Sequence, residues 1–286
     1  SRLLSRRLRT KEYTQASSEA TIASIYSAVK GIGCTVFAVA LAATLRRETG
    51  QGVVVVDLGG APTGQAWLHG GDASSAARRV SVGLTSEEQL ASALTTHPGG
   101  FHVLAAGDLL SDEHGEQTIA PLLSALVNRF PYVLIDLPAE VSPAVVKALA
   151  QSDIIYLLAD TDKEHVVRTN VLLHQVRSSI GEAEQRVKIV LNKVEAAPDR
   201  SGLFGLLTPQ DEERLTPADI AQQLGQPIGF TLPYLSLEES GGLTVDVLLR
   251  ILERRDTSYA LTLRRIARDL GGLLIGLALG SGAALG

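Results

Sequence analysis

Four consecutive valines, Val53–Val56, followed by Asp57, are the feature that most limits how this chain can fold. A strand with one solvated face alternates apolar and polar side chains, whereas an unbroken apolar run is typical of a strand buried on both faces. Other short apolar runs recur along the chain, at Ile22–Ser27, Phe101–Ala105, Tyr132–Asp136, Asp153–Ala159, Val187–Leu191 and Ile228–Leu232. The pattern predicts an α/β fold of three layers, with helices on both faces of a mostly parallel sheet of about six to eight strands.

Segments with helical periodicity separate these runs and supply the predicted covering layers. They are Thr35–Arg47, Ala120–Phe130, Ser142–Gln151, Lys163–Ser178, Pro217–Leu224 and Thr257–Leu270. Residues 64–99 are less regular, and residues 197–216 are polar and predict a surface excursion. Within that excursion, Gly202–Leu207 is either an apolar anchor of the loop or a small interaction patch.

Composition excludes several classes of protein. Of 286 residues, 45% are hydrophobic and 20% are charged, which indicates a folded globular chain. A net charge of −5 argues against a general nucleic-acid binder, so no nucleic-acid partner is expected. The single cysteine, Cys34, excludes an intrachain disulfide framework and a multi-cysteine zinc site. No apolar stretch follows the basic N-terminus, so no signal peptide is predicted and a cytoplasmic location is expected.

The segment Ser27–Thr35 joins the first predicted strand to the first predicted helix, where a phosphate-binding loop belongs. Glycines at 31 and 33 let backbone N–H groups turn toward an anion, and the helix N-terminus adds positive potential. Such a loop also needs a Lys for the β- and γ-phosphates and a hydroxyl for Mg²⁺. Thr35 supplies the hydroxyl, but Cys34 occupies the position of the Lys.

Residues 21–255 resemble the ParA/MinD family of deviant P-loop ATPases, whose loop reads Ser-x-Lys-Gly-Gly-x-Gly-Lys-Thr. The matching residues are Ser27, Gly31, Gly33 and Thr35, and the departures are Val29, Lys30 and Cys34. The resemblance continues in the strands that end at Asp57, at Asp136 and at Asn192, and in Ile228–Tyr234. Gly59 replaces the second acid that positions the attacking water in the family.

The resemblance implies ATP or ADP with Mg²⁺ as the cofactor and a homodimer as the assembly. The implied nucleotide site comprises Lys30, Gly31, Gly33, Cys34, Thr35, Asp57, Asp136 and Asn192. Thr35 and Asp136 would hold the metal, and Asn192 would contact the base. Loss of both lysines and of the second acid removes most of what phosphoryl transfer requires. Three alternatives remain: a scaffold without nucleotide, binding without hydrolysis, and a weak ATPase that uses Lys30. A reactive Cys34 thiol at the helix N-terminus is a further, minor reading.

The C-terminal residues 275–286 resemble the opening strand and glycine-rich loop of bacterial patatin-like phospholipases. Gly280, Ser281, Gly282 and Gly286 match the loop that forms the oxyanion hole there, whereas Leu285 replaces the usual Arg. Residues 263–272 are similar to the segment before the catalytic domain of neuropathy-target-esterase-like proteins. No Gly-x-Ser-x-Gly nucleophile motif occurs in the chain, so these residues do not predict catalysis by the chain itself. An apolar tail or a truncated membrane segment is the alternative interpretation.

These resemblances predict three parts: residues 1–20 as a basic helix end and linker, 21–255 as the P-loop domain, and 256–286 as a connecting helix with the first hydrolase strand. The absence of methionine also suggests a piece of a longer polypeptide. We therefore expect a regulatory or scaffold domain of a patatin-like (lyso)phospholipase, with cyclic-nucleotide-binding-like and patatin domains in cis. The alternative is a ParA/MinD-like localisation protein of the pilus-assembly type.

Two further groups of side chains each allow two interpretations. Several arginines near the C-terminus would suit a membrane surface at the inner membrane face, or a solvated helix face; they are Arg254, Arg255, Arg264, Arg265 and Arg268. A loop-like region holds residues of metal-ligand type, which more simply are solvated polar groups; they are His102, Asp108, Asp112 and His114.

Overall fold

The structure is a computed structural model that describes residues 20–59, 62–69, 87–110, 114–181, 185–194, 214–235, 242–254 and 256–273. Several predicted features lie outside these residues: the basic segment 1–19, the patch Gly202–Leu207, Asp112, Arg255, and the predicted hydrolase loop with Gly280, Ser281, Gly282 and Gly286.

The described residues form an eight-stranded sheet of order β3-β4-β2-β5-β1-β6-β7-β8. Its strands are β1 Thr21–Ser27, β2 Val53–Asp57, β3 Thr95–Thr96, β4 His102–Ala105, β5 Tyr132–Asp136, β6 Ile154–Ala159, β7 Val187–Val194 and β8 Ile228–Pro233. Every pair of neighbouring strands is parallel except the short edge pair β3–β4. The predicted three-layer, mostly parallel α/β fold is therefore confirmed.

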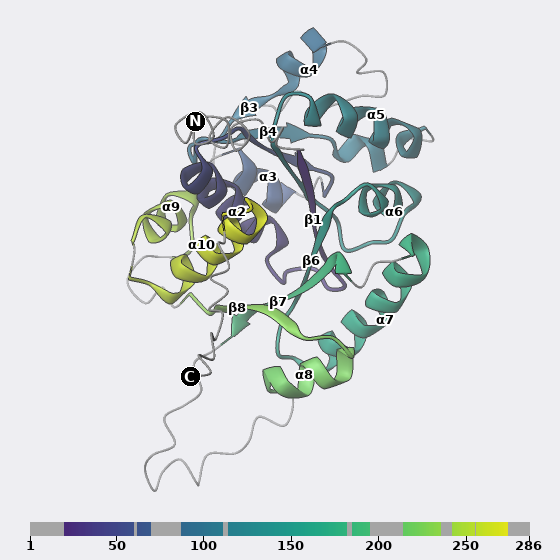
Figure 1. Cartoon of the computed structure of the whole chain (residues 1–286), viewed down its shortest axis with the longest axis vertical. Coiled ribbons are helices and arrows are strands. Elements are labelled where there is room, and N and C mark those ends of the chain that lie inside the picture. Colours follow the sequence, from purple (N-terminus) through teal and green to yellow (C-terminus); the bar gives the residue numbers. More distant parts are fainter. Residues whose placement is uncertain are drawn as a thin grey trace, which may run out of the picture.

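Helices cover both faces of the sheet, as Figure 1 shows. Their bounds are α2 Cys34–Thr49, α3 Pro62–Leu68, α4 Glu87–Ala93, the 3₁₀ helix η1 Gly107–Leu110, α5 Gly115–Val127, α6 Pro143–Ala150, α7 Lys163–Ile180, α8 Pro217–Leu224, α9 Val245–Glu253 and α10 Ser258–Leu270. One face packs against α2, α9 and α10, and the other against α5, α6, α7 and α8.

The valine run of β2 shows why a continuous apolar strand forms here. Val54 and Val56 pack into the core beneath α5 and α6, whereas Val53 and Val55 pack into the core beneath α2. Successive side chains of a strand point to opposite faces, so a sheet covered on both faces needs an apolar residue at every position.

The sequence prediction missed helix α9, which lies in a segment left unassigned. Its buried residues Val245, Leu248 and Leu252 follow helical spacing, so the signal was present in the sequence. Helix α5 begins at Gly115 rather than at Ala120, so Pro121 lies inside it. The buried Ile119 lies in this earlier turn, so core packing extends the helix toward its N-terminus.

Helix α10, the predicted connecting helix, packs against α2 and β8. Leu263, Ile266 and Ala267 are fully buried in the core that α2 also enters. Arg268 Nε donates to Glu48 of α2 at 2.7 Å, and Lys188 of β7 forms an ion pair with Asp269. The helix thus completes one covering layer of the sheet. Among the described residues, no helix is both long and apolar enough to cross a membrane.

Candidate phosphate-binding site

Five strands point their carboxyl ends toward the same edge of the sheet, because β2, β5, β1, β6 and β7 run parallel as neighbours. Asp57 and Asp136 are the last residues of their strands, and Ser27 ends β1. Asn192 lies near the end of β7. In open α/β sheets, ligands bind at this edge, outside the strand ends. The topology therefore gathers residues that are far apart in the sequence.

The loop between β1 and α2 has the backbone of an anion cradle. Gly31 and Gly33 have φ angles of 83° and 108°, in the left-handed region that favours glycine. A Cβ atom on Gly33 would lie 2.8 Å from Asn192 Nδ2, so a side chain is also excluded by space. The first helical hydrogen bond runs from Phe37 N to Gly33 O at 2.9 Å, which leaves the N–H groups of residues 34–36 at the helix N-terminus for a ligand.

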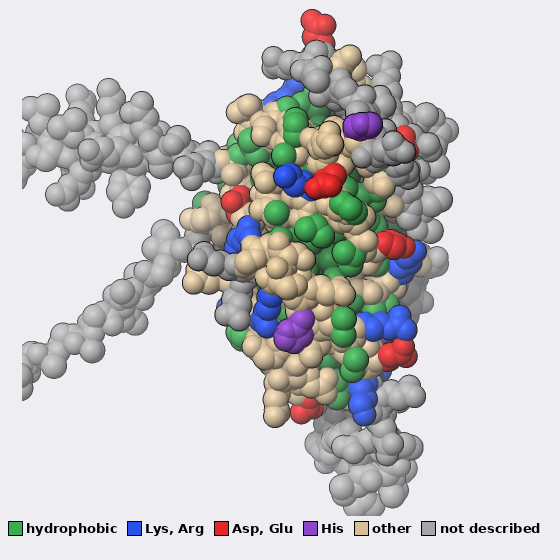
Figure 2. Space-filling view, turned by 90° about the vertical axis from the view of Figure 1, so that its right-hand side faces the viewer, with side chains coloured by type: hydrophobic (Ala, Val, Ile, Leu, Met, Phe, Trp, Pro, Cys, Tyr) green, Lys and Arg blue, Asp and Glu red, His purple; other side chains and the backbone are tan. Residues whose placement is uncertain are grey.

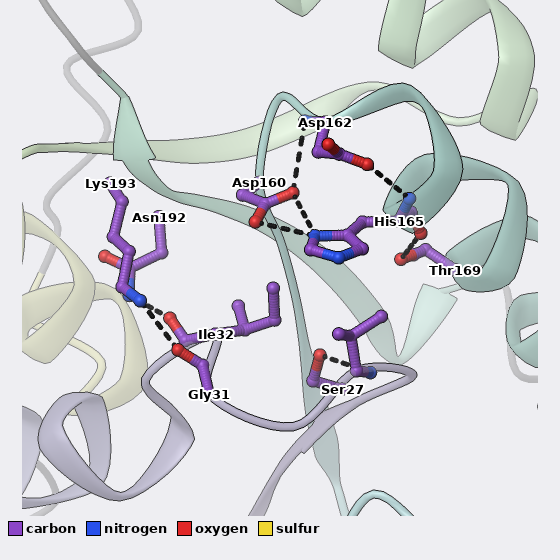
Figure 3. Close-up of polar contacts among 10 residues, drawn as sticks. Ser27, Gly31, Ile32, Asp160, Asp162, His165, Thr169, Asn192 and Lys193 are labelled. Atoms are coloured by element: carbon purple, nitrogen blue, oxygen red, sulfur yellow. Dashed lines mark hydrogen bonds and ion pairs between the residues drawn. The ribbon is translucent and has the colours of Figure 1, made fainter. Parts of the chain in front are cut away.

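Two consecutive residues of β7 hold this loop from outside (Figure 3). Asn192 Nδ2 donates to Ile32 O at 2.8 Å, and Lys193 Nζ donates to Gly31 O at 2.6 Å. In a trans peptide, the C=O and the next N–H point in opposite directions. Fixing the two carbonyls toward β7 therefore turns the N–H groups of Ile32 and Gly33 away from β7.

Thr35 and Asp136 form a hydroxyl–carboxylate pair beside the loop. Thr35 Oγ1 donates to Asp136 Oδ2 at 2.6 Å, and Gly64 of α3 lies against Thr35. Burial raises the pKa of Asp136 to about 7, the Thr35 hydrogen bond lowers it, and the neighbouring Asp57 carboxylate raises it. Hydroxyl and carboxylate oxygens are ligands that suit Mg²⁺. The residues present at this helix N-terminus therefore fit the metal that the sequence predicts.

Two cavities meet at the loop. The first, of about 460 Å³, lies between the loop, Asp136 and Glu140, with Trp67 on its wall. The second, of about 640 Å³, lies between the loop, Asn192 and Tyr234. Gly31 and Gly33 line both cavities. A ligand with a charged end and an apolar, planar end could occupy both at once.

The structure corrects one interpretation of Cys34. The residue opens α2, but burial raises the pKa of its thiol, and the nearby Asp136 carboxylate raises it further. Both effects favour the neutral thiol and so argue against an activated nucleophile. Lys30, the proposed substitute for the missing Lys, instead forms an ion pair with Glu140, and its side chain is 78% exposed.

Helix α7 begins after β6 at Lys163, where the sequence predicts a helix. The Asp162 side chain accepts from His165 N at 3.0 Å and so caps the helix. A contact that the sequence analysis missed lies next to it: Asp160 Oδ2 is 2.9 Å from Nδ1 of His165 (Figure 3). The spacing of five residues across a strand end gives no recognisable signal in one sequence.

The other predicted groups do not gather into sites. Among the described residues, no cluster of three or more His, Cys, Asp or Glu side chains could hold a metal by itself. The predicted group around His102 is therefore not a metal centre in this part of the chain, since the His102 ring packs against Phe130. Two of the C-terminal arginines, Arg264 and Arg268, form ion pairs with Glu48, and Arg265 lies over the Phe230 ring.

Comparison with known proteins shows which of them share this fold. No model of a known protein family matches the chain, and no curated protein sequence matches it. Solved structures of ParA and MinD proteins are similar to it over 88–90% of its length. The MinD protein in the MinC:MinD complex of Aquifex aeolicus has a TM-score of 0.64 and 19% identity, over 90% of this chain and 98% of that chain.

Two further neighbours carry nucleotides. A plasmid partition protein from Borrelia burgdorferi bound to AMPPNP has a TM-score of 0.60 and 14% identity, over 90% of this chain and all of that one. MinD from Pyrococcus horikoshii, complexed with Mg-ADP, has a TM-score of 0.60 and 15% identity, over 89% of this chain and 97% of that one. At these identities the likeness concerns the fold: the chain has the P-loop architecture of ParA and MinD ATPases.

Proposed function

We propose that this chain binds a magnesium nucleotide, ATP or ADP, at the loop Gly31–Thr35 and does not hydrolyse it efficiently. It would act as a nucleotide-dependent binding module in a ParA/MinD-like localisation or partition process. The observation that carries the proposal is the preformed loop, whose carbonyls Asn192 and Lys193 hold from outside at 2.8 and 2.6 Å.

The retained geometry favours binding over a scaffold that has lost its ligand. A glycine with a φ of 108° and no room for a Cβ atom is a specific requirement, and the chain meets it at Gly33. Thr35 and Asp136 also keep their contact at 2.6 Å. When bound, Mg²⁺ would neutralise phosphate charge between these two residues. Asp136 would lose its proton to the solvent as the cation arrives, because a nearby cation lowers the pKa of a carboxyl.

The chemistry of the loop argues against rapid hydrolysis. Catalysis of phosphoryl transfer rests on positioning and on charge neutralisation. The position next to Thr35 holds the neutral thiol of Cys34, and Lys30 is paired with Glu140 at the rim. Gly59 follows the strand of Asp57 where the water-positioning acid would stand. Removal of one charge-stabilising donor from an active site costs about 10²–10³-fold in rate, and this chain lacks several.

Isothermal titration of Mg·ATP and Mg·ADP into the chain tests the proposal. We expect measurable binding of both, weakened at least about tenfold by Thr35→Ala, which is roughly one lost charge-assisted contact. Thr49→Ala, at the far end of the same helix, is the matched control and should bind as the unaltered chain does. Phosphate release should stay near background. The absence of binding heat at millimolar nucleotide would refute the proposal and favour a scaffold.

Assembly is the next feature of the proposal. Figure 2 shows apolar side chains gathered across the middle of the face that α6 and α7 build. Val167 and Val171 of α7, and Val141 just before α6, are each more than half exposed. Exposed apolar patches of this kind are typical of interaction sites. We propose that the chain self-associates when nucleotide is bound, and light scattering with and without Mg·ATP would detect a doubled mass.

The patatin-like hydrolase parent remains a prediction. The residues that carry it, 275–286, lie outside the described part of the chain, and the structural neighbours reported above lend it no support. Determination of the sequence beyond Gly286 would decide it, because a Gly-x-Ser-x-Gly motif within a few dozen residues is required for that parent.

A further inference from the structure

The two cavities that meet at the loop differ in what lines them. Tyr234 and Tyr259 line the second cavity beside the Asn192 amide. The first cavity, and not the second, is lined by Thr35 and Asp136, the pair that fits Mg²⁺. A planar base stacks on aromatic side chains, whereas phosphates accompany the metal. A nucleotide that crosses the loop would therefore place its terminal phosphate in the first cavity.

The backbone of the loop can hold a phosphate group without help from a lysine. The N–H groups of residues 34–36 lie at the helix N-terminus without a partner in the preceding turn. The N–H groups of Ile32 and Gly33 are turned away from β7, the strand that borders the second cavity. Donors arranged in this way stabilise an anion seated in the loop. A further phosphate, beyond the loop, depends on the side chains of the first cavity.

The charges of the first cavity oppose such a further phosphate. Among the described residues that line it, the charged side chains are Lys30, Asp136 and Glu140. Lys30 forms an ion pair with Glu140, so the carboxylate offsets its positive charge. Asp136 accepts from the neutral Thr35 hydroxyl, and the Asp57 carboxyl is its register partner on β2. Carboxylates thus outnumber ammonium groups in the described lining, and an added anion meets net negative charge.

Cys34 contributes no positive charge to offset this excess. A Lys at this place in a P-loop reaches the β- and γ-phosphates. Here the position lines the first cavity with a thiol, and burial favours the neutral form of that thiol by raising its pKa. Space is not the obstacle, because the cavity of about 460 Å³ is within the usual range of ligand sites. Charge therefore limits what the first cavity can accept.

We propose that this site selects nucleoside diphosphates over triphosphates, so that Mg·ADP binds at least about tenfold more tightly than Mg·ATP. The inference rests on the proposed function and names the ligand class of the same site. The additional phosphate of ATP carries negative charge into a cavity whose described lining is already negative, and like charges at such short range repel. Each nucleotide carries one Mg²⁺, so the metal does not cancel the difference between them.

Titration calorimetry of Mg·ADP and Mg·ATP into the full chain tests this selection. Glu140→Gln removes a carboxylate from the first cavity and leaves the charge of Lys30 without its partner. The ratio of the two dissociation constants should shrink by about threefold, mainly because Mg·ATP binds more tightly. The Glu140 side chain is 59% exposed, so the fold should tolerate the change. Glu253→Gln, the matched control, removes the same charge beside Arg47 and Glu48 at the other end of α2 and should leave the ratio unchanged.

A second variant supplies the missing charge directly. Cys34→Lys should tighten Mg·ATP more than Mg·ADP and so remove most of the preference. Circular dichroism and thermal unfolding establish that each variant is folded. Equal affinities of the unaltered chain for the two nucleotides, or tighter binding of Mg·ATP, overturn the selection while nucleotide binding stands. A preference that both variants leave unchanged overturns its origin in charge. Failure of the unaltered chain to bind either nucleotide overturns the proposed function and this inference together.

Discussion

Asp57 and Asp136 are register partners at the ends of the adjacent parallel strands β2 and β5, and both are buried. Their juxtaposition follows from topology alone, since neither position is near the other in sequence. Burial raises the pKa of Asp136 to about 7, and the neighbouring Asp57 carboxylate adds a smaller rise because two carboxylates so placed cannot both be charged at low cost. The site is therefore poised to bind either a proton or a cation.

The first prediction concerns stability against pH without metal. Between about pH 4 and 7, folded Asp136 holds a proton that the unfolded chain has released, so its contribution to stability is lost as pH rises through 7. Asp136→Asn should remove this slope and raise the unfolding temperature at pH 8 in EDTA. The accompanying gain in the free energy of unfolding should be at most a few kcal/mol, since one pKa unit corresponds to about 1.4 kcal/mol.

The unaltered chain must be compared with Asp136→Asn because His97 changes the pH dependence of stability in the opposite direction. Burial lowers the pKa of His97 to about 4, so its contribution weakens as pH falls below about 6.5. Thermal unfolding of both proteins at pH 5, 6, 7 and 8 isolates the effect of Asp136. Parallel curves for the two proteins would contradict the raised pKa.

The second prediction concerns restoration of the loop. Cys34→Lys should raise the affinity for Mg·ADP at least about tenfold, because it returns a cation to the phosphate side of the loop. Hydrolysis should rise less, since Gly59 and Val29 stay as they are. Cys34→Ala is the neutral control, and calorimetry with a phosphate-release assay gives both quantities. A rise in affinity in the Ala variant as well would show that the thiol obstructs the ligand.

The third prediction concerns thiol reactivity. Because burial and Asp136 raise the pKa of Cys34, alkylation by iodoacetamide at pH 8 should be at least about tenfold slower in the folded chain than in urea. Mass spectrometry over time measures both rates. Equal rates would mean that the thiol is exposed and ionised.

The fourth prediction separates backbone strain from steric crowding at Gly33 and Gly50, the two glycines that flank helix α2. Gly50→Ala places a side chain at a φ of 69° with nothing within 4 Å, and should cost about 1 kcal/mol in free energy of unfolding. Gly33→Ala adds a clash with Asn192 at 2.8 Å and should cost about 2 kcal/mol or more. Urea unfolding measures both. In an Asn192→Ala background the excess cost at Gly33 should shrink, and a persistent excess would locate the strain elsewhere.

The fifth prediction concerns helix α10. Ile266 is fully buried in the core beneath α2, so Ile266→Ala should lower the free energy of unfolding by about 2–4 kcal/mol. Leu261→Ala, at a half-exposed position of the same helix, should cost well under 1 kcal/mol. Equal small effects would mean that α10 is a detachable connector, as the sequence-based boundary at residue 256 suggests.

The layers of the fold could be predicted from the sequence because they depend on periodicity. The run Val53–Val56 is typical of a strand covered on both faces, and the glycines at 31 and 33 favour a turn between a strand and a helix. The same local reasoning extends to helix α7, which is predicted over Lys163–Ser178 and found at Lys163–Ile180. The sequence analysis missed α9. The apolar residues of this helix follow helical spacing, but they lie beyond a polar segment.

Tertiary structure alone decided what surrounds the loop. The pairing of Thr35 with Asp136 was expected from a resemblance, but the raised pKa of Asp136 depends on burial and on Asp57 in the next strand. The direction of the Lys193 side chain depends on a β-bulge, in which Asn192 and Lys193 of β7 stand opposite the single residue Leu232 of β8. Sequence periodicity encodes which face of an element is apolar; burial, register and the charge next to a given atom arise only when distant elements pack together.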